Sequence, residues 1–63
     1  MTIKDHESKC KAARAAIDAC RQAWLAAAPC SPERREANAA MAVAMRCSAD
    51  AHFAAWQATG RLF

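Results

Sequence analysis

The residues that interrupt helices are concentrated at one place in this chain, and they divide it into two helical segments. Nineteen of the 63 residues are alanine, which has the highest helix propensity of any residue. Both prolines lie in the segment Pro29-Cys30-Ser31-Pro32, and the single glycine is Gly60. We therefore expect one all-α domain over residues 1–63, with a helix over 3–27, a turn over 28–31, a second helix over 32–59 and a short tail over 60–63.

The start of the second helix carries the strongest local signal. Ser31 can cap the free backbone N–H groups, Pro32 suits the first helical position, and Glu33 complements the helix dipole. Thr2 followed by Asp5 three residues later is a weaker version of the same signal for the first helix. No part of the sequence has the alternation that is typical of a β-strand.

Each predicted helix has small or apolar residues alternately three and four positions apart, which is the spacing of a helix-packing seam. In the first helix these positions are Ile3, His6, Cys10, Ala13, Ile17, Cys20, Trp24 and Ala27. In the second helix they are Ala37, Ala40, Ala44, Cys47, Ala51, Ala54 and Ala58. Two such seams joined by a tight turn predict an antiparallel hairpin in which the helices approach closely.

Four cysteines, at positions 10, 20, 30 and 47, are many for so short a chain. Such enrichment is typical of disulfides or a metal supplementing a small core. Cys10 and Cys47 are equidistant from the boundary between Ala28 and Pro29, so a hairpin turning there predicts a Cys10–Cys47 disulfide. The remaining pair, Cys20 and Cys30, requires the chain to double back sharply. The pairs Cys10–Cys20 and Cys30–Cys47 would lie along single helices, about 15 and 25 Å apart, which is too far for a disulfide. The nested pairs are therefore favoured.

A zinc site is the alternative use of these cysteines. The predicted hairpin brings two cysteines and two histidines to its open end, and such a set can bind zinc tetrahedrally in a reducing compartment. These residues are His6, Cys10, Cys47 and His52. We favour the disulfide, flanked by two exposed histidines, and therefore expect no cofactor.

A second apolar stripe runs along the second helix beside the predicted seam. Its members are Met41, Met45, Phe53 and Trp56, with His52 in the same row. A two-helix unit has one internal seam and cannot bury both faces of a helix. We expect the stripe either to be wrapped by the hairpin's own tail or to bind another protein.

The spacing Cys10-x9-Cys20, with the apolar Ile17 three residues before the second cysteine, resembles half of the twin Cys-x9-Cys helical hairpins of the mitochondrial intermembrane space. The end of the chain, with Cys47, Trp56, Gly60 and Phe63, is similar to that of a small peripheral cytochrome oxidase subunit of this class. The resemblance implies two antiparallel helices with nested disulfides, and a role as an accessory subunit or assembly component of a respiratory complex. The chain departs from the family pattern at residue 37, an alanine where the third cysteine is expected.

Other classes of function find little support in the composition. The net charge of +3 is mild, and acidic residues at positions 7 and 18 interrupt the basic row on the first helix, so nucleic-acid binding is not expected. A Cys/His nucleophile would need an enclosed cleft, and a single glycine excludes a phosphate-binding loop, so we expect no enzyme. No apolar run approaches the roughly 20 residues of a membrane span, and no secretory signal is evident.

Two kinds of protein therefore fit the sequence. The first is a disulfide-clamped structural or assembly component in the mitochondrial intermembrane space, which docks its apolar stripe on a larger complex. The second is a small regulator of bacterial or phage type that binds a partner protein in a reducing cytoplasm, with a homodimeric four-helix bundle as one form it can take. No small-molecule substrate is expected for either.

Overall fold

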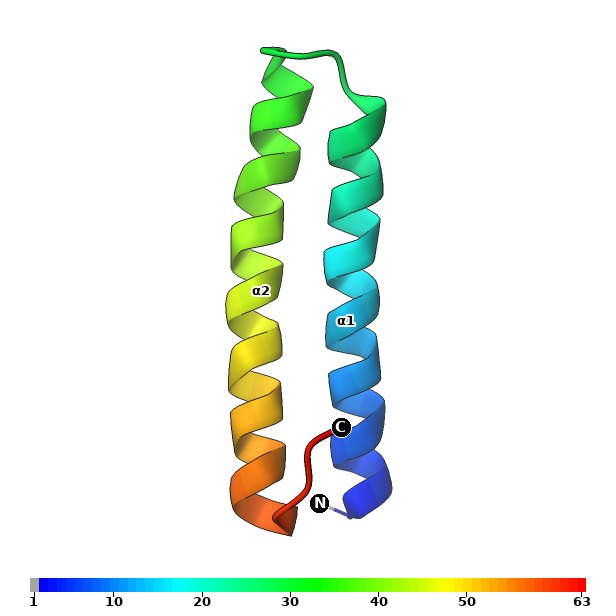
Figure 1. Ribbon diagram of the computed structural model, residues 1–63, viewed down its shortest axis with the longest axis vertical. Helices are drawn as coiled ribbons and strands as arrows, with labels where there is room; N and C mark the ends of the chain where they lie inside the picture. Colours follow the sequence, from blue (N-terminus) through cyan, green and yellow to red (C-terminus); the bar gives the residue numbers. More distant parts are fainter. Residues whose placement is uncertain (1) are drawn as a thin grey trace.

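The chain forms a hairpin of two long antiparallel helices in the computed structural model, which describes residues 2–63 (Figure 1). Helix α1 spans Ile3–Ala26 and helix α2 spans Pro32–Thr59. The molecule is a rod of 42 × 15 × 14 Å, and its described residues include no β-strand. The all-helical hairpin expected from the sequence is confirmed, with α1 ending at residue 26.

A capping box begins α1. The Asp5 backbone N–H donates to the Thr2 hydroxyl at 3.2 Å, and the Thr2 backbone N–H donates to the Asp5 carboxylate at 2.9 Å. Each side chain thus satisfies a backbone donor that has no partner within the helix. This pair defines the first turn of α1 at the open end of the hairpin.

The capping box gives the stability of the open end a defined dependence on pH. The hydrogen bonds from Thr2, first from its backbone and then from its side chain, lower the pKa of the Asp5 carboxyl below 3.8. A folded-state pKa below the unfolded value means that the stabilisation is full above the unfolded pKa and is lost as the pH falls through the folded one. We expect Asp5→Asn to reduce the steepness of acid unfolding below pH 4, followed by circular dichroism; unchanged acid unfolding would contradict this role.

The turn between the helices depends on one residue in a left-handed conformation. Cys30 has φ 61°, a region that non-glycine residues rarely adopt. The next residue, Ser31, is the N-cap of α2, and its hydroxyl accepts the Arg34 N–H at 3.1 Å. The Ser31 N–H in turn donates to the Ala28 carbonyl at 3.2 Å. Together these bonds reverse the chain within a few residues and start α2 at Pro32.

At its other end α2 is stopped by Gly60, whose φ of 71° is left-handed and whose N–H donates to the Trp56 carbonyl at 2.8 Å. The last three residues then fold back along the open end of the hairpin toward α1 (Figure 1). The tail is fixed there by Arg14 of α1, whose guanidinium donates to the main-chain oxygen of Phe63 at 2.7 Å.

The face that α1 presents to α2 is largely the one expected from the sequence. His6 and Cys10 are buried, and the half-buried positions continue the same row toward the turn; they are Ala13, Ile17, Cys20, Trp24 and Ala27. Only Ile3, which lies at the open end, leaves the expected row, because 46% of its surface is exposed. Bulky residues in α1 therefore predicted its orientation well.

The face that α2 presents to α1 differs from the expected one, and four of the seven seam positions predicted between residues 37 and 58 are wrong. The buried or half-buried residues that form the row facing α1 are Ala37, Met41, Ala44, Ser48, Ala51, Ala55 and Thr59, and Arg34 and His52 beside this row are also half-buried. Ala40, Cys47, Ala54 and Ala58 are exposed instead. A helix turns by about 100° per residue, so replacing Cys47 by Ser48 in the seam swings the cysteine out of the interface. The rotation brings the larger Met41 into the seam in place of Ala40.

Little apolar surface is buried between the two helices. Among the described residues the buried apolar side chains are Cys10 and Ala55, both completely covered, and Ala37. The accessible surface is 4656 Å², whereas a folded monomer of this mass is expected to expose about 4,000 Å². The hairpin alone thus leaves more surface in contact with water than a compact monomer of its mass.

Candidate protein-docking surface

One flank of α2 carries the largest group of exposed apolar side chains on the molecule. Met45, Phe53 and Trp56 are 55%, 58% and 51% exposed. The rings of Phe53 and Trp56 lie 6.3 Å apart between centroids, at an interplanar angle of 31°. At 3.6 residues per turn, these three positions and Ala49 share one side of the helix, about a quarter-turn from the seam. We call the residues Met45, Ala49, Phe53 and Trp56 the α2 flank.

The C-terminal tail extends the α2 flank. Leu62, which is 85% exposed, lines an open depression of about 380 Å³ together with His52, Phe53 and Trp56. The sequence left open whether the tail or another protein would cover this stripe. The tail lies at the end of the α2 flank, but the large side chains of the flank stay exposed.

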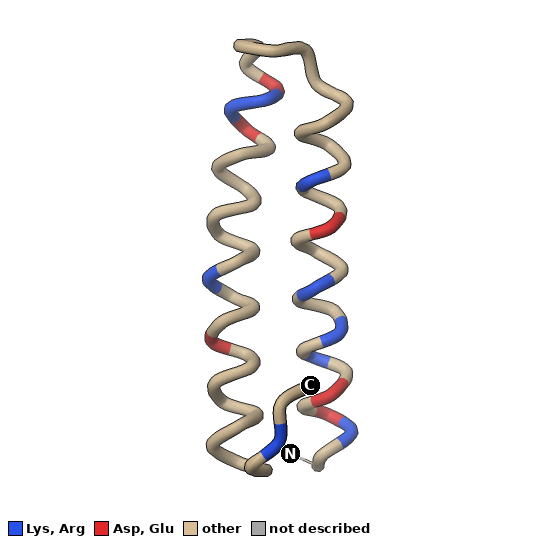
Figure 2. Tube along the Cα trace, in the orientation of Figure 1, with Lys and Arg blue, Asp and Glu red and all other residues tan. Residues whose placement is uncertain are grey.

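The α2 flank carries no formal charge. Between Glu36 and the end of α2, the charged residues are Arg46 and Asp50, and both lie on the outer side of the helix, next to the flank. Figure 2 shows that charged positions are spread along α1, whereas those of α2 are grouped near its start, with only Arg46 and Asp50 farther along the helix. An uncharged apolar strip with an ionic edge is the usual composition of a protein-binding surface.

A polar network fixes the side of the flank that faces α1. Arg14 can only donate, so its contact with His52 Nε2 at 3.1 Å requires that nitrogen to accept. The other nitrogen, Nδ1, then carries the proton and donates to the Ser48 carbonyl at 2.7 Å. This arrangement is that of a neutral imidazole, and it positions His52 against the depression. The same Arg14 nitrogen binds the tail, so one side chain links all three segments.

The four expected partner-binding residues have separated into two groups. Met45, Phe53 and Trp56 remain exposed on the flank, while Met41 is half-buried in the seam in line with Ala37 and Ser48. Leu62 joins the exposed group from the tail. The sequence placed Leu62 in a short apolar tail that could wrap the stripe of α2, but it did not identify Leu62 as part of a docking surface.

All four cysteines are free thiols. Cys10 is completely buried in the seam, whereas Cys47 is exposed and its neighbour Ser48 is buried instead. Cys20 is half-buried in the seam, and Cys30 is exposed in the turn. The expected Cys10–Cys47 and Cys20–Cys30 disulfides therefore receive no support from the structure. The physical reason for the first pair is the rotation of α2.

The alternative zinc ligands are affected by the same rotation. Within residues 2–63, no group of three or more His, Cys, Asp or Glu side chains is arranged to hold a metal ion. His6 and Cys10 are buried in the seam and His52 is held by Arg14, but Cys47 points to solvent. The residues present therefore do not form the tetrahedral set that the sequence suggested.

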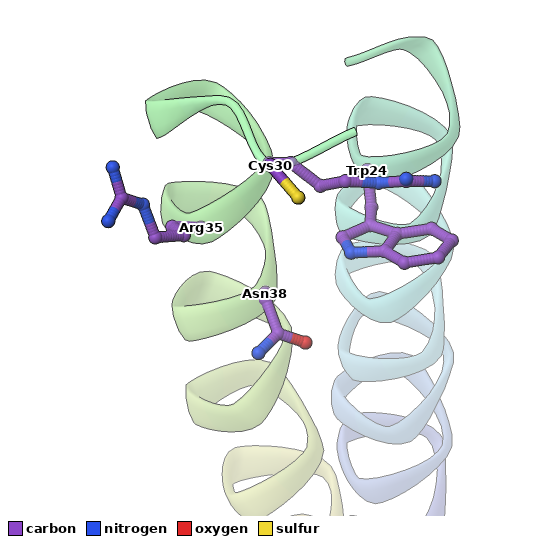
Figure 3. A pocket seen from close by; sticks show the side chains of 5 residues that line it. Trp24, Cys30, Arg35 and Asn38 are labelled. Atoms are coloured by element: carbon purple, nitrogen blue, oxygen red, sulfur yellow. The ribbon is translucent and has the colours of Figure 1, made fainter. Parts of the chain in front are cut away.

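A second open hollow lies at the turn, lined by Trp24, Cys30, Arg34, Arg35 and Asn38. In Figure 3 the Cys30 sulfur points toward the Trp24 indole, whereas Arg35 extends away from it. The Arg34 guanidinium lies 3.6 Å from the centre of the Trp24 ring, which is a cation–π contact. This stacking covers the Arg34 Nε atom, which is buried without a hydrogen-bond partner. The stacked pair beside this hollow therefore holds α1 and α2 together at the turn end of the hairpin.

The Trp24–Arg34 contact was not predicted from the sequence. The contact joins the last turns of α1 to the first turn of α2, which an antiparallel hairpin brings together. Arg34 carries a charge, so it does not belong to any row of apolar residues in the sequence.

Comparisons with known proteins do not assign the chain to a family. No protein-family model, curated protein or solved structure matches it. Neither helix has a stretch sufficiently long and apolar to cross a membrane, as judged over residues 2–63.

Proposed function

We propose that this protein is a non-catalytic helical hairpin that acts by binding another protein through the α2 flank. The observation that carries the proposal is the exposure of Met45, Phe53 and Trp56 along one uncharged side of α2. Contiguous exposed apolar side chains mark interaction surfaces, and tryptophan is among the residues that contribute most binding energy in them. Both hollows on the surface are open, which favours binding over catalysis.

The docking role is compatible with the accessory-subunit function expected from the family resemblance, but the disulfide clamp is a separate matter. A Cys10–Cys47 bond requires α2 to turn by about 100°, so that Cys47 replaces Ser48 in the seam. That rotation would take Met41 out of the seam and would turn every other side chain of α2, including Trp56, by the same angle. We therefore propose the unstapled form, which suits a reducing compartment such as the bacterial cytoplasm.

The test is affinity capture from the source organism with three versions of the chain. We expect a partner to be retained by the wild-type protein and lost with Phe53→Ser/Trp56→Ser, at least about tenfold in affinity, because two central apolar anchors are removed. Val43→Ser is the matched control, since Val43 is as exposed, at 57%, but lies on the opposite side of α2. Equal capture by all three proteins would contradict the proposal.

A further inference from the structure

We propose that the partner that covers the α2 flank is a second copy of this chain, with the two α2 helices antiparallel and crossing at Ala49. This inference rests on the proposed function, because it names the occupant of the same surface. It would convert the hairpin into an assembly of four helices in which the α2 pair forms the central contact.

The exposed area has the size that such a dimer needs. The accessible surface of 4656 Å² exceeds the value for a compact monomer of 6.8 kDa by roughly 700 Å². A stable protein–protein interface of standard size buries about 800 Å² on each partner. The internal seam cannot be enlarged to absorb this excess, because alanine and serine occupy most of its α2 side. A second copy would bury a comparable area without any change in the hairpin.

The α2 flank is complementary to itself. A two-fold axis through Ala49 places Met45 of one chain opposite Phe53 of the second copy, and the reverse, as a symmetric interface requires. The same axis places the small Ala42 opposite the large Trp56. Alternating large and small side chains allow two helices to interdigitate, and Ala49 at the centre permits a close crossing.

The charges at the edge of the flank fit the same arrangement. With the axis at Ala49, Arg46 of one chain lies within one helical turn of Asp50 of the second copy, and the pair occurs twice. Neither Arg46 nor Asp50 has an ion-pair partner within its own chain among residues 2–63. The opposite charges would fix the antiparallel direction of the two helices and exclude the parallel one.

Sedimentation equilibrium of the full chain across a concentration series tests the inference. We expect twice the mass of one chain, 6.8 kDa, and a dimer at least about 30-fold weaker for Phe53→Ser/Trp56→Ser. The control Val43→Ser should dimerise like the wild type. A monomer at all concentrations, or a dimer weakened by Val43→Ser instead, would overturn the proposal.

A charge exchange separates loss of the dimer from loss of the fold, since it alters only exposed side chains. Asp50→Arg should weaken the dimer by a few-fold, and the double variant Arg46→Asp/Asp50→Arg should restore it while circular dichroism stays unchanged. Failure of the double variant to restore the dimer contradicts the crossing at Ala49. A monomeric wild-type chain that still captures another protein through the flank leaves the docking function standing and removes only the second copy as its partner.

Discussion

Ala55→Leu should lower the free energy of unfolding by about 1–3 kcal/mol, because it adds three carbon atoms where the helices are in contact. Ala55 is completely buried between α1 and α2. The helices are held close by small side chains, so a leucine at this position must push α2 away from α1 or adopt a strained rotamer. Chemical denaturation followed by circular dichroism measures the difference directly.

The neighbouring substitution Ala54→Leu is the matched control. Ala54 is exposed on the side of α2 opposite the docking flank, so the same chemical change should alter stability by no more than about 0.5 kcal/mol. The alanine and cysteine spacing of the sequence predicted the reverse, with Ala54 in the seam. Destabilisation by Ala54→Leu and tolerance of Ala55→Leu would therefore contradict the orientation of α2.

The hairpin and its turn could be predicted from the sequence because each depends on local chemistry. Pro29, Pro32 and Gly60 restrict the backbone in ways that other residues do not, and Ser31 caps the helix that follows. The seam of α1 was also predictable, since Ile17 and Trp24 are bulky and lie in one row. These signals do not depend on the partner helix.

The orientation of α2 could not be read in the same way. Ten of the alanines lie in this helix, so several rows of small residues satisfy the three-and-four spacing equally well. The choice between them is made by packing: Met41 enters the seam beside Ala37, and Arg34 stacks on Trp24. Of the expected docking residues, Met45, Phe53 and Trp56 remain exposed in this packing. Cys47 also becomes exposed, so it is in position neither for the expected disulfide with Cys10 nor for the alternative zinc site.

Exchanging residues 47 and 48 should create the disulfide that the wild-type chain lacks. In Cys47→Ser/Ser48→Cys the cysteine moves from an exposed position of α2 to a buried one, on the face of α2 that packs against α1, where Cys10 is also buried. Oxidation should then link residues 10 and 48, and closing this long loop should stabilise the oxidised protein by about 2–4 kcal/mol relative to the reduced one. The wild type is a control of identical composition and mass.

The most direct test of how α2 faces α1 is peptide mapping of these two proteins after mild oxidation. A hairpin that buries Ser48 and exposes Cys47 gives a link between residues 10 and 48 in the exchanged variant, and a Cys10 thiol that stays free in the wild type. A wild-type protein linked from Cys10 to Cys47, with an exchanged variant that stays reduced, would show that α2 turns its other side to α1 and would contradict the seam that contains Met41, Ser48 and Ala55.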